Sequence, residues 1–315
     1  MSQSRVPRRT LIVLVLAAAS WGVGTVISKR AVAEIQPFVL LAVQLTASVV
    51  ALGIVLILTR RRAQPGAGPL RTASPASLDR LGLLNPGAAY ALSLIGLTQI
   101  TASLSVLLWA GEPILILILA WAWLREPITR RLVGLSIAGL AGIALVTWSP
   151  GLAGQGGGIV VTLAGVGCCA VYSVMARTRI GAATSTVRVV FGQQVWALGL
   201  ALLMLLTSVI VAPSASSDQP AAPVSIGAWA SAVVSGLVYY GLAYGFYLNG
   251  LRRVPASVAA SAFYLIPVFG VTAGWAFLGE RLDPAQLIGA GIILTGVSLL
   301  ATSPMVTGAP EPGTS

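Results

Sequence analysis

Residues 274–283 read GWAFLGERLD, and residues 120–129 read AWAWLREPIT. In both phrases a run of small, apolar and aromatic residues stops at an acidic residue, and the two phrases lie 154 positions apart. Two similar segments at such a spacing indicate an internal structural repeat, which is detectable as weak internal symmetry of the sequence. The spacing of these two phrases is therefore the starting point for the fold.

The match continues at the same shift over residues 90–146 without a gap. Identical pairs include Tyr90 and Tyr244, Leu94 and Leu248, Pro113 and Pro267, Trp121 and Trp275, Glu126 and Glu280, and Gly142 and Gly296. Earlier segments match more faintly, with Lys29 opposite Arg177 and Gln44 opposite Gln194. We expect one unit over residues 1–150, a second over 151–303, and a disordered tail over 304–315, where glycine and proline are frequent.

The composition indicates that lipid surrounds most of this chain. Of the 315 residues, 57% are hydrophobic and 9% are charged, whereas a soluble domain usually has about 25% charged residues. Histidine is absent, and Lys29 is the only lysine. A soluble protein of this size would need a charged surface that this chain does not provide.

A helix needs about 20 apolar residues to cross the hydrocarbon core of a bilayer. The first apolar run could be a signal peptide, but the similar runs that follow it favour a retained span. The fold class is thus an all-α polytopic membrane protein with ten transmembrane helices, which we expect near residues 11–28, 36–59, 81–98, 103–124, 131–148, 158–176, 187–211, 228–249, 256–278 and 285–302.

Basic residues orient these spans. If both termini are cytoplasmic, 16 of the 19 basic residues fall in cytoplasmic segments and 3 fall outside, as the positive-inside rule requires. The basic residues lie in short gaps between apolar runs and do not line one helix face, so the net charge of +11 does not indicate nucleic-acid binding. Anionic lipid at the cytoplasmic surface is a sufficient partner for them.

Each predicted unit has five spans, and five is an odd number, so the second unit crosses the membrane in the opposite direction. Inverted repeats are typical of transporters that work by alternating access, with the substrate site near the middle of the membrane between the repeats.

Three segments carry a family resemblance: SWGVGTVISK at 20–29, GLTQITASLSVLLWAGEPILILILAWAWLRE at 96–126, and GLRRVPASVAASAFYLIPVFGVTAGWAFLGE at 250–280. On these segments the chain resembles the ten-helix EamA family of the drug/metabolite transporter superfamily. The resemblance implies export or import of small metabolites, often amino acids, across the bacterial inner (cytoplasmic) membrane, and of the two directions it favours export. The chain departs from the pattern at Cys169, where a tryptophan like Trp21 is expected.

Glu112 is the acidic residue that we expect in the middle of a span, directly before Pro113. A charged carboxylate at the centre of a bilayer costs about 2.5–3.5 kcal/mol on insertion scales, so it must be protonated, paired or exposed to a watery cavity. It is a candidate for proton coupling or for binding a substrate amine, and the alternative is a neutral residue that bonds another helix. The second unit has Ile266 at the equivalent place.

Aromatic residues gather in the eighth span, where Tyr240, Tyr244 and Tyr247 share one helix face. Further aromatic residues lie in spans that the resemblance places around the cavity. An aromatic belt at the membrane interface is the alternative. With Glu112, we expect a substrate-binding set of Trp21, Tyr90, Trp109, Glu112, Tyr172, Tyr240, Tyr244, Tyr247 and Tyr264.

Two other groups receive simpler interpretations. Glu126 and Glu280 each precede a residue suited to cap the next helix, Thr129 or Asp283, so we expect each acid to face the positive end of that next helix. Gating is the alternative.

Cys168 and Cys169 are adjacent in an apolar run, and we expect two small buried hydrophobic side chains that form no disulfide.

The residue types also exclude functions. No span has a basic residue at its middle, which argues against phosphorylated substrates. The chain lacks the His, Cys, Asp and Ser groupings of enzymes, so we predict no enzyme activity, no metal and no cofactor. The partners we expect are a small-molecule substrate, the bilayer and protons, for a monomer or a homodimer. The predicted function is export of a small metabolite by alternating access, and the alternatives are a multidrug or cation exporter and a membrane scaffold.

Overall fold

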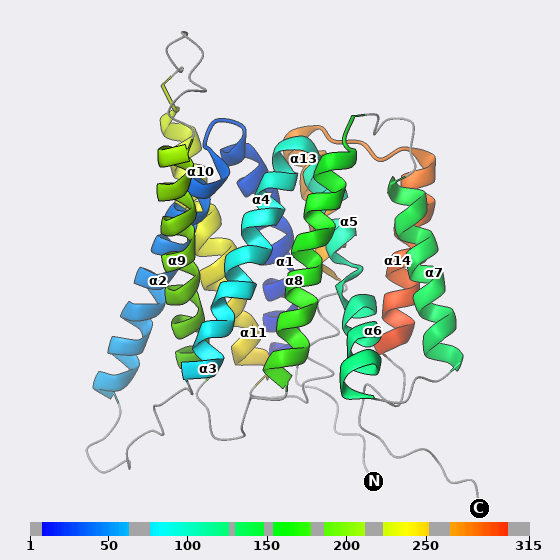
Figure 1. The fold of residues 1–315 in the computed structure, drawn as a ribbon, viewed down its shortest axis with the longest axis horizontal. Helices are drawn as coiled ribbons and strands as arrows, with labels where there is room; N and C mark the ends of the chain where they lie inside the picture. Colours follow the sequence, from blue (N-terminus) through cyan, green and yellow to red (C-terminus); the bar gives the residue numbers. More distant parts are fainter. Residues whose placement is uncertain are drawn as a thin grey trace, which may run out of the picture.

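The computed structural model describes residues 8–62, 76–125, 130–147, 154–177, 186–211, 223–251 and 265–301. Within these ranges every regular element is a helix and there is no strand (Figure 1). The start of α1 and the end of α14 lie at the same end of the bundle (Figure 1), which we call the terminal end. The other end, where α1 finishes, is called the far end.

The first half of the chain contains two helices that are interrupted partway. Its elements are α1 (Arg8–Val32), α2 (Pro37–Arg62), α3 (Ala76–Asp79), the 3₁₀ turn η1 (Arg80–Leu83), the π-helical turn η2 (Leu84–Ala88), α4 (Ala89–Gln99), α5 (Ala102–Trp109), α6 (Glu112–Leu124) and α7 (Arg130–Thr147). The second half contains α8 (Gly156–Arg177), α9 (Thr186–Val211), α10 (Ile226–Ser235), the π-helical segment η4 (Gly236–Leu242), α11 (Ala243–Leu251), α13 (Ile266–Leu278) and α14 (Pro284–Ala301).

Seven helical segments of the described chain are long and apolar enough to cross a membrane. Three shorter apolar helices lie at Val133–Thr147, Ile266–Leu278 and Pro284–Gly296. The multi-pass membrane character is thus confirmed, while the count of ten spans stays a prediction because these three helices fall short of the spanning length. The predicted disordered tail and the boundary near residue 150 lie outside the described residues.

The repeat is visible in the geometry of equivalent helices. α6 and α13 have the same length of 13 residues and each has proline as its second residue, Pro113 and Pro267. Each also ends on a left-handed residue, Arg125 with φ of 53° and Gly279 with φ of 66°. These positions differ by the shift of 154 found in the sequence. The two helices lie toward opposite ends of the bundle (Figure 1), as an inverted repeat requires.

The π-helical segments obey the same shift, since η2 and η4 end at the equivalent residues Ala88 and Leu242. Near each segment a glycine allows the backbones of two helices to meet. A Cβ atom on Gly236 would lie 2.6 Å from the backbone of Gln44, and one on the equivalent Gly82 would clash with the backbone of Gln193. Both copies therefore use a glycine to seat this helix against a glutamine-bearing neighbour.

The span expected near 103–124 is found as the apolar segment Ala102–Trp123, but its helix is interrupted, because α5 ends at Trp109 and α6 begins at Glu112. Proline has no N–H and its ring conflicts with the carbonyl four residues earlier, so Pro113 belongs in the first turn of a helix. Glu112 is consequently the first residue of α6 and not a residue in the middle of a helix.

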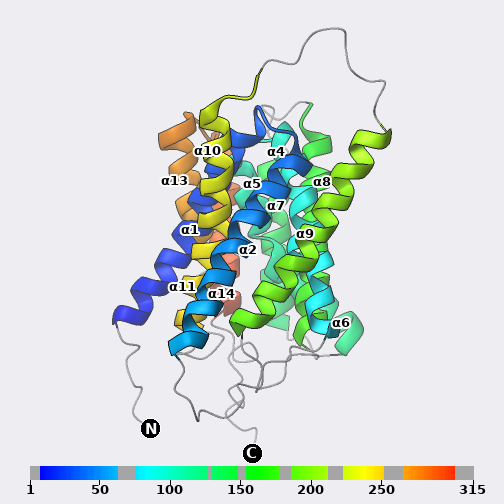
Figure 2. The same ribbon diagram turned by 90° about the vertical axis from the view of Figure 1, so that its left-hand side faces the viewer.

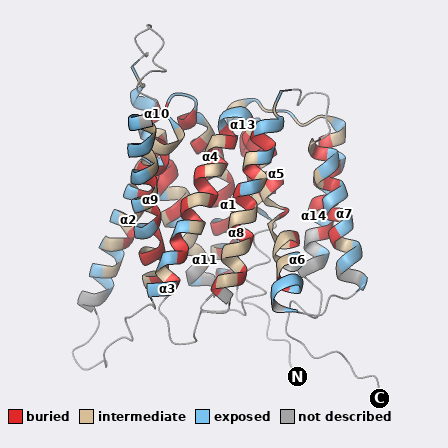
Figure 3. Cartoon of the chain, in the orientation of Figure 1, coloured by how far each residue is buried: buried red, intermediate tan, exposed pale blue. Residues whose placement is uncertain are grey.

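The distribution of exposed side chains fits a bundle surrounded by lipid. Apolar residues on the outer faces of α2, α7 and α9 are exposed, whereas α5 is buried along nearly its whole length (Figure 3). Figure 2 shows the same bundle from the side, with α2 and α9 inclined across it. α7 and α14 pack closely, since a Cβ on Gly142 would lie 2.9 Å from the carbonyl oxygen of Gly289. Such small residues let transmembrane helices approach each other.

The start of α14 shows how polar side chains satisfy backbone groups. Asp283 caps α14, because its Oδ1 accepts from the Gln286 N–H at 2.9 Å while Gln286 Oε1 accepts from the Asp283 N–H at 3.1 Å. This reciprocal pair is a capping box and confirms the cap expected at Asp283. Thr129 lies outside the described residues.

Candidate functional site

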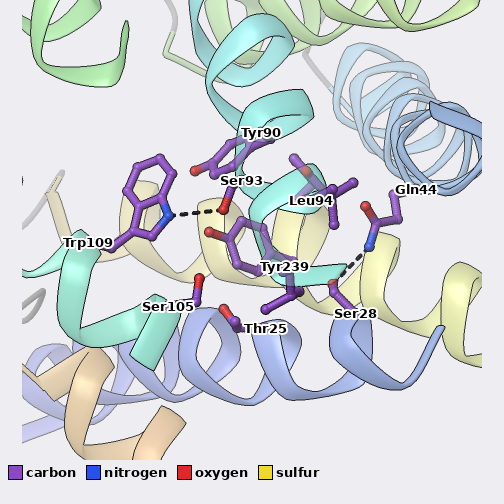
Figure 4. Close-up of a pocket in the computed structure, with 11 residues that line it drawn as sticks. Thr25, Ser28, Gln44, Tyr90, Ser93, Leu94, Ser105, Trp109 and Tyr239 are labelled. Carbon is purple, nitrogen blue, oxygen red and sulfur yellow. Dashed lines mark hydrogen bonds between the residues drawn. The ribbon is translucent and has the colours of Figure 1, made fainter. Parts of the chain in front are cut away.

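A small cavity lies between α1, α2, α4, α5 and η4, so both repeats contribute to its wall (Figure 4). Its volume is ≈ 20 Å³, whereas one water molecule needs about 10–15 Å³ on this measure. Five of its non-aromatic side chains carry a hydroxyl or amide group: Thr25, Ser28, Gln44, Ser93 and Ser105. The cavity is therefore polar, and it holds a group no larger than one or two water molecules.

Four aromatic rings, with Tyr90 at their centre, and two leucines, Leu94 and Leu97, form the rest of the wall. The Tyr90 ring stacks on Trp109 with centroids 5.3 Å apart and meets Tyr239 and Tyr240 edge-on at 5.2 and 5.3 Å. The Trp109 indole N–H donates to Ser93 Oγ at 3.0 Å (Figure 4). Three expected site residues, Tyr90, Trp109 and Tyr240, thus come together at this cavity.

A second aromatic group lies beside the first. The Trp21 ring meets Tyr244 at 5.3 Å and Tyr247 at 5.8 Å between centroids, both edge-on. The Tyr172 hydroxyl donates to Gln193 Oε1 at 3.0 Å, and Tyr172 is close enough to Tyr244 and Tyr247 to interact with them electrostatically. Tyr264 lies outside the described residues, so its place in the site stays a prediction.

Glu112 accepts hydrogen bonds from two residues of α8. Its Oε1 is 3.2 Å from the Cys169 thiol and 3.3 Å from the Ser173 hydroxyl. Cys169 is buried and free, as expected, but it is not simply a hydrophobic side chain because its thiol donates this bond, and Cys168 is only partly buried. This carboxyl group interacts electrostatically with three nearby tyrosines, Tyr172, Tyr239 and Tyr247. Glu112 also begins α6, and the start of a helix favours an anion.

The two departures from the repeat meet in this contact. Cys169 stands where Trp21 stands in the first repeat, and Glu112 stands where Ile266 stands in the second. At one of these two contacts between the repeats, Ile266 packs against the aromatic cluster around Trp21, and at the other Cys169 donates to Glu112. The small thiol leaves room for a carboxyl group and gives it a donor. The chain is thus asymmetric at one pair of equivalent contacts.

Several residues that line the cavity were not among the site residues predicted from the sequence. Tyr239 resembles its tyrosine neighbours, and the serines resemble any serine that bonds within its own helix. Only the meeting of α1, α4 and α5 brings Ser28, Ser93 and Ser105 to one cavity. The sequence signal that could have found part of the site is the paired substitution at Cys169 and Glu112, because each is a break in the same repeat.

At the far end, Glu280 joins the two repeats. Its Oε1 accepts from the Ala102 N–H at 2.8 Å, and its Oε2 accepts from the Ser103 N–H at 2.8 Å and the Ser103 hydroxyl at 2.7 Å. The expectation that Glu280 faces the start of the next helix, α14, is wrong, because it caps α5 of the other repeat. Glu126 lies outside the described residues.

Lys29 completes this junction, which we call the far-end clamp (Lys29, Leu97, Ile100, Ala102, Ser103 and Glu280). The Lys29 ammonium donates to the carbonyl oxygens of Leu97 and Ile100, each at 2.7 Å, and it attracts Glu280 electrostatically. The Lys29 ammonium lies at the end of α4, where the helix dipole is negative, and the Glu280 carboxylate lies at the start of α5, where the helix dipole is positive. Both charges are therefore favourably placed.

Comparisons with known proteins agree with this architecture. The model of the EamA-like transporter family matches residues 8–148 and again residues 156–302. The chain is 27% identical over 306 residues to "Uncharacterized transporter YvbV" of Bacillus subtilis (strain 168), covering 93% of this chain and 92% of that protein. It is 25% identical over 223 residues to "Uncharacterized transporter YyaM" of the same organism, covering 69% and 70%.

A solved crystal structure superposes with a TM-score of 0.60 over 93% of this chain and 97% of its own, at 19% identity, which shows a shared fold. The family model covers each of the two halves separately, and these halves are the repeats seen in α6 and α13. The sequence repeat, the equivalent helices α6 and α13, and the match of the family model to both halves agree with one another. The chain therefore belongs to the EamA-like transporter family.

Proposed function

We propose that this chain exports small metabolites such as amino acids across the bacterial inner membrane by alternating access. The observation that carries the proposal is the cavity of ≈ 20 Å³ whose wall comes from both repeats. Inverted repeats that meet at a central site are the usual basis of alternating access. Family membership and transporter-named relatives support transport itself. The direction of transport, export, rests on the family resemblance.

The size of the cavity has a consequence for the mechanism. A space of ≈ 20 Å³ admits a head group but not a whole amino acid. The repeats must therefore separate around the cavity before a metabolite can enter or leave. The far-end clamp ties the two repeats together, so we propose that its three Glu280 hydrogen bonds break when the far end opens.

Orientation follows from the basic side chains. Of the basic residues in the described helices, Arg8 and Arg9 start α1 and three arginines, residues 60–62, end α2 at the terminal end (Figure 1), whereas only Lys29 and Arg30 of α1 lie near the far end. Combined with the excess of arginine expected in cytoplasmic segments, this favours a cytoplasmic terminal end. The far-end clamp then closes the outer side.

A cation exporter is the second candidate, and Glu112 favours it. Its hydrogen bonds come from a thiol and a hydroxyl, and in the described part of the chain no basic side chain is bonded to it. A carboxyl group held in this way can take up either a proton or a cationic substrate. A scaffold without transport activity is the remaining alternative, and it predicts no solute flux.

The test is transport in membrane vesicles that contain the purified protein. Uptake and efflux of a metabolite panel of amino acids, organic cations and organic acids are measured with and without an imposed pH gradient. Protein-dependent efflux of at least one solute class supports the proposal. Absence of flux for every class, in vesicles where the protein is shown to be folded, contradicts it and favours the scaffold.

A further inference from the structure

A groove runs between α7 and α14, the last helices of the two repeats. These helices lie side by side at one edge of the bundle (Figure 1). The groove has a volume of ≈ 380 Å³, and ligand sites commonly measure about 300–1,000 Å³. Apart from one threonine its lining is apolar: Leu135, Ala138, Ile288, Gly291, Ile292, Thr295, Gly296 and Leu299. The groove therefore suits an apolar ligand.

The groove opens on the outer surface of the bundle. Two of its lining residues, Ile288 and Leu299, are 58% and 42% exposed. The large apolar side chains of Ile137 and Leu287, in the same two helices, are 61% and 57% exposed. In a chain that crosses the membrane several times, an exposed apolar surface of this kind lies against lipid.

The groove depends on a glycine that breaks the repeat. A Cβ atom on Gly291 would meet no atom within 4 Å, so the space beside this residue is open. At the shift of 154, the equivalent residue of the first repeat is Ile137. α14 therefore lacks a side chain at a position where α7 carries a bulky one, and most of the lining residues belong to α14.

The dimensions of the groove fit a single hydrocarbon chain. Its lining follows α14 from Ile288 to Leu299, a stretch of about 16 Å at the rise of an α-helix. One leaflet supplies about 15 Å of a hydrocarbon core about 30 Å thick. Spread over that stretch, the volume of ≈ 380 Å³ gives a mean cross-section of about 24 Å².

This cross-section excludes a helix of a second copy. A helix about 10 Å across has a cross-section of about 80 Å², which is too wide for the groove. A hydrocarbon chain is much thinner, because its carbon atoms approach neighbouring atoms to about 4 Å. A lipid chain is therefore the occupant that the groove fits best.

Basic residues lie at one end of the groove. Leu299 is two residues before the end of α14 at the terminal end, and α7 begins at the same end with Arg130 and Arg131 (Figure 1). The start of a helix itself favours an anion. The terminal end is the end that we propose to be cytoplasmic, and anionic head groups of that leaflet attract basic residues. A phospholipid combines a phosphate with an apolar chain, as this arrangement requires.

We propose that the groove between α7 and α14 binds one acyl chain of an anionic phospholipid, whose phosphate lies at the start of α7, where Arg130 and Arg131 supply positive charge. The lipid would contact both repeats, because Leu135 and Ala138 belong to α7 and the other lining residues belong to α14. The proposal goes beyond the proposed transport function. Its test measures no solute flux, so failure of one leaves the other standing.

Two lipids with the same chains test the head-group preference. Delipidated protein in detergent is titrated with dipalmitoyl phosphatidylglycerol, which is anionic, or with dipalmitoyl phosphatidylcholine, which is zwitterionic, and binding is measured by native mass spectrometry. We expect the first phosphatidylglycerol to bind roughly tenfold more tightly, because two arginines attract its charge. Arg130→Gln combined with Arg131→Gln should remove this preference. Equal affinity for both lipids, or a preference that survives the double variant, overturns the proposal.

A second pair of variants locates the chain. Gly291→Phe places a ring in the open space of the groove and should weaken phosphatidylglycerol binding by roughly tenfold, because the chain loses its packing contacts. Gly134→Phe is the matched control, since a Cβ atom on Gly134 also meets no atom within 4 Å but Gly134 does not line the groove. Unchanged affinity in Gly291→Phe, or an equal loss in both variants, contradicts the assignment of the chain to this groove.

The same spectra report the oligomeric state. A dimer that Gly291→Phe separates into monomers, while Gly134→Phe leaves it intact, would assign the groove to a second copy and overturn the lipid proposal. Thermal melts of the variants check that a lost affinity does not reflect unfolding. If Gly291→Phe alone melts early, the arginine double variant still decides the proposal, because its substitutions lie at the end of a helix.

Discussion

The carboxyl group of Glu112 accepts hydrogen bonds from two side chains of α8, the Cys169 thiol and the Ser173 hydroxyl. Both donors can also bond to the amide oxygen of glutamine, so Glu112→Gln should fold normally while losing the titratable group. If Glu112 carries a coupled proton, this variant should lose accumulation driven by a pH gradient and keep passive exchange of substrate. Transport in reconstituted vesicles with an imposed gradient measures both.

Glu34→Gln is the matched control for this prediction. Glu34 lies between α1 and α2 and binds Ser225, so the control removes a carboxylate outside the membrane-spanning helices. We expect it to retain gradient-driven transport. Full gradient-driven activity in Glu112→Gln would contradict the proton role and leave Glu112 as a packing residue.

Tyr244 offers a second test at the scale of one residue. Its ring meets Trp21 edge-on at 5.3 Å, and such aromatic pairs contribute about 0.5–1.5 kcal/mol beyond the burial of their area. If the pair shapes the substrate path, Tyr244→Ala should lower transport by up to roughly tenfold at unchanged protein abundance, following the conversion of 1.4 kcal/mol per factor of ten. Unchanged transport with a properly inserted protein would show that the aromatic wall is not part of the path.

At the scale of elements, α5 connects the far-end clamp to the cavity. Its first residues, Ala102 and Ser103, bind Glu280, and its last residue, Trp109, lines the cavity. Each residue from Ala102 to Leu108 is buried, so α5 cannot shift at one end without disturbing its contacts at the other. This geometry makes α5 the element through which opening of the far end would reach the site.

Glu280→Gln tests the clamp. An amide presents only one acceptor oxygen, so the variant loses a charge and at least one of three bonds, each worth about 1.5–3 kcal/mol when an acceptor is charged. We expect a lower melting temperature and a faster reaction of a cysteine introduced as Thr25→Cys, in a Cys168→Ser and Cys169→Ser background, with a thiol reagent added at the far end. Thr25 lines the cavity, so its reactivity reports access from that side.

The chain offers a close control for the clamp. Glu34 accepts from the Ser225 N–H at 2.8 Å and from its hydroxyl at 2.9 Å, at the start of α10. These two bonds, the backbone bond first, lower the pKa of Glu34. A lowered pKa means that the contact is complete at neutral pH and is lost only as the pH falls through that value. Because Glu34 is exposed, we expect Glu34→Gln to change Thr25→Cys labelling little. An equal effect of both variants would contradict the clamp.

At the scale of the whole molecule, the arrangement of the helices predicts how the protein is oriented in the membrane. The described chain starts and ends at one end of the bundle (Figure 1), so we predict that both termini are cytoplasmic. A reporter that fluoresces only in the cytoplasm should give signal when fused after Ser315 and none when inserted between residues 212 and 222. The second site follows α9, which runs from the terminal end to the far end (Figure 1). A reversed pattern would contradict the orientation and place the clamp on the inner side.

Sequence alone predicted the membrane class, the repeat and the family. These features depend on hydropathy and on residues compared at a constant shift, which need no knowledge of contacts in space. The cap at Asp283 was also predictable, because its partner Gln286 lies three positions away. Pro113 could have indicated the end of α5, since the restriction that proline imposes is local.

Tertiary structure alone decided the partners of Glu280, Gln44 and Glu112. Ser103 is 177 positions from Glu280, Ser235 is 191 positions from Gln44, and Cys169 is 57 positions from Glu112. Serines and glutamines give no periodic signal in an apolar helix, so the pattern of one helix cannot say which neighbour its polar side chain will meet. The cavity exists because helices of both repeats converge, and that convergence depends on how whole helices pack.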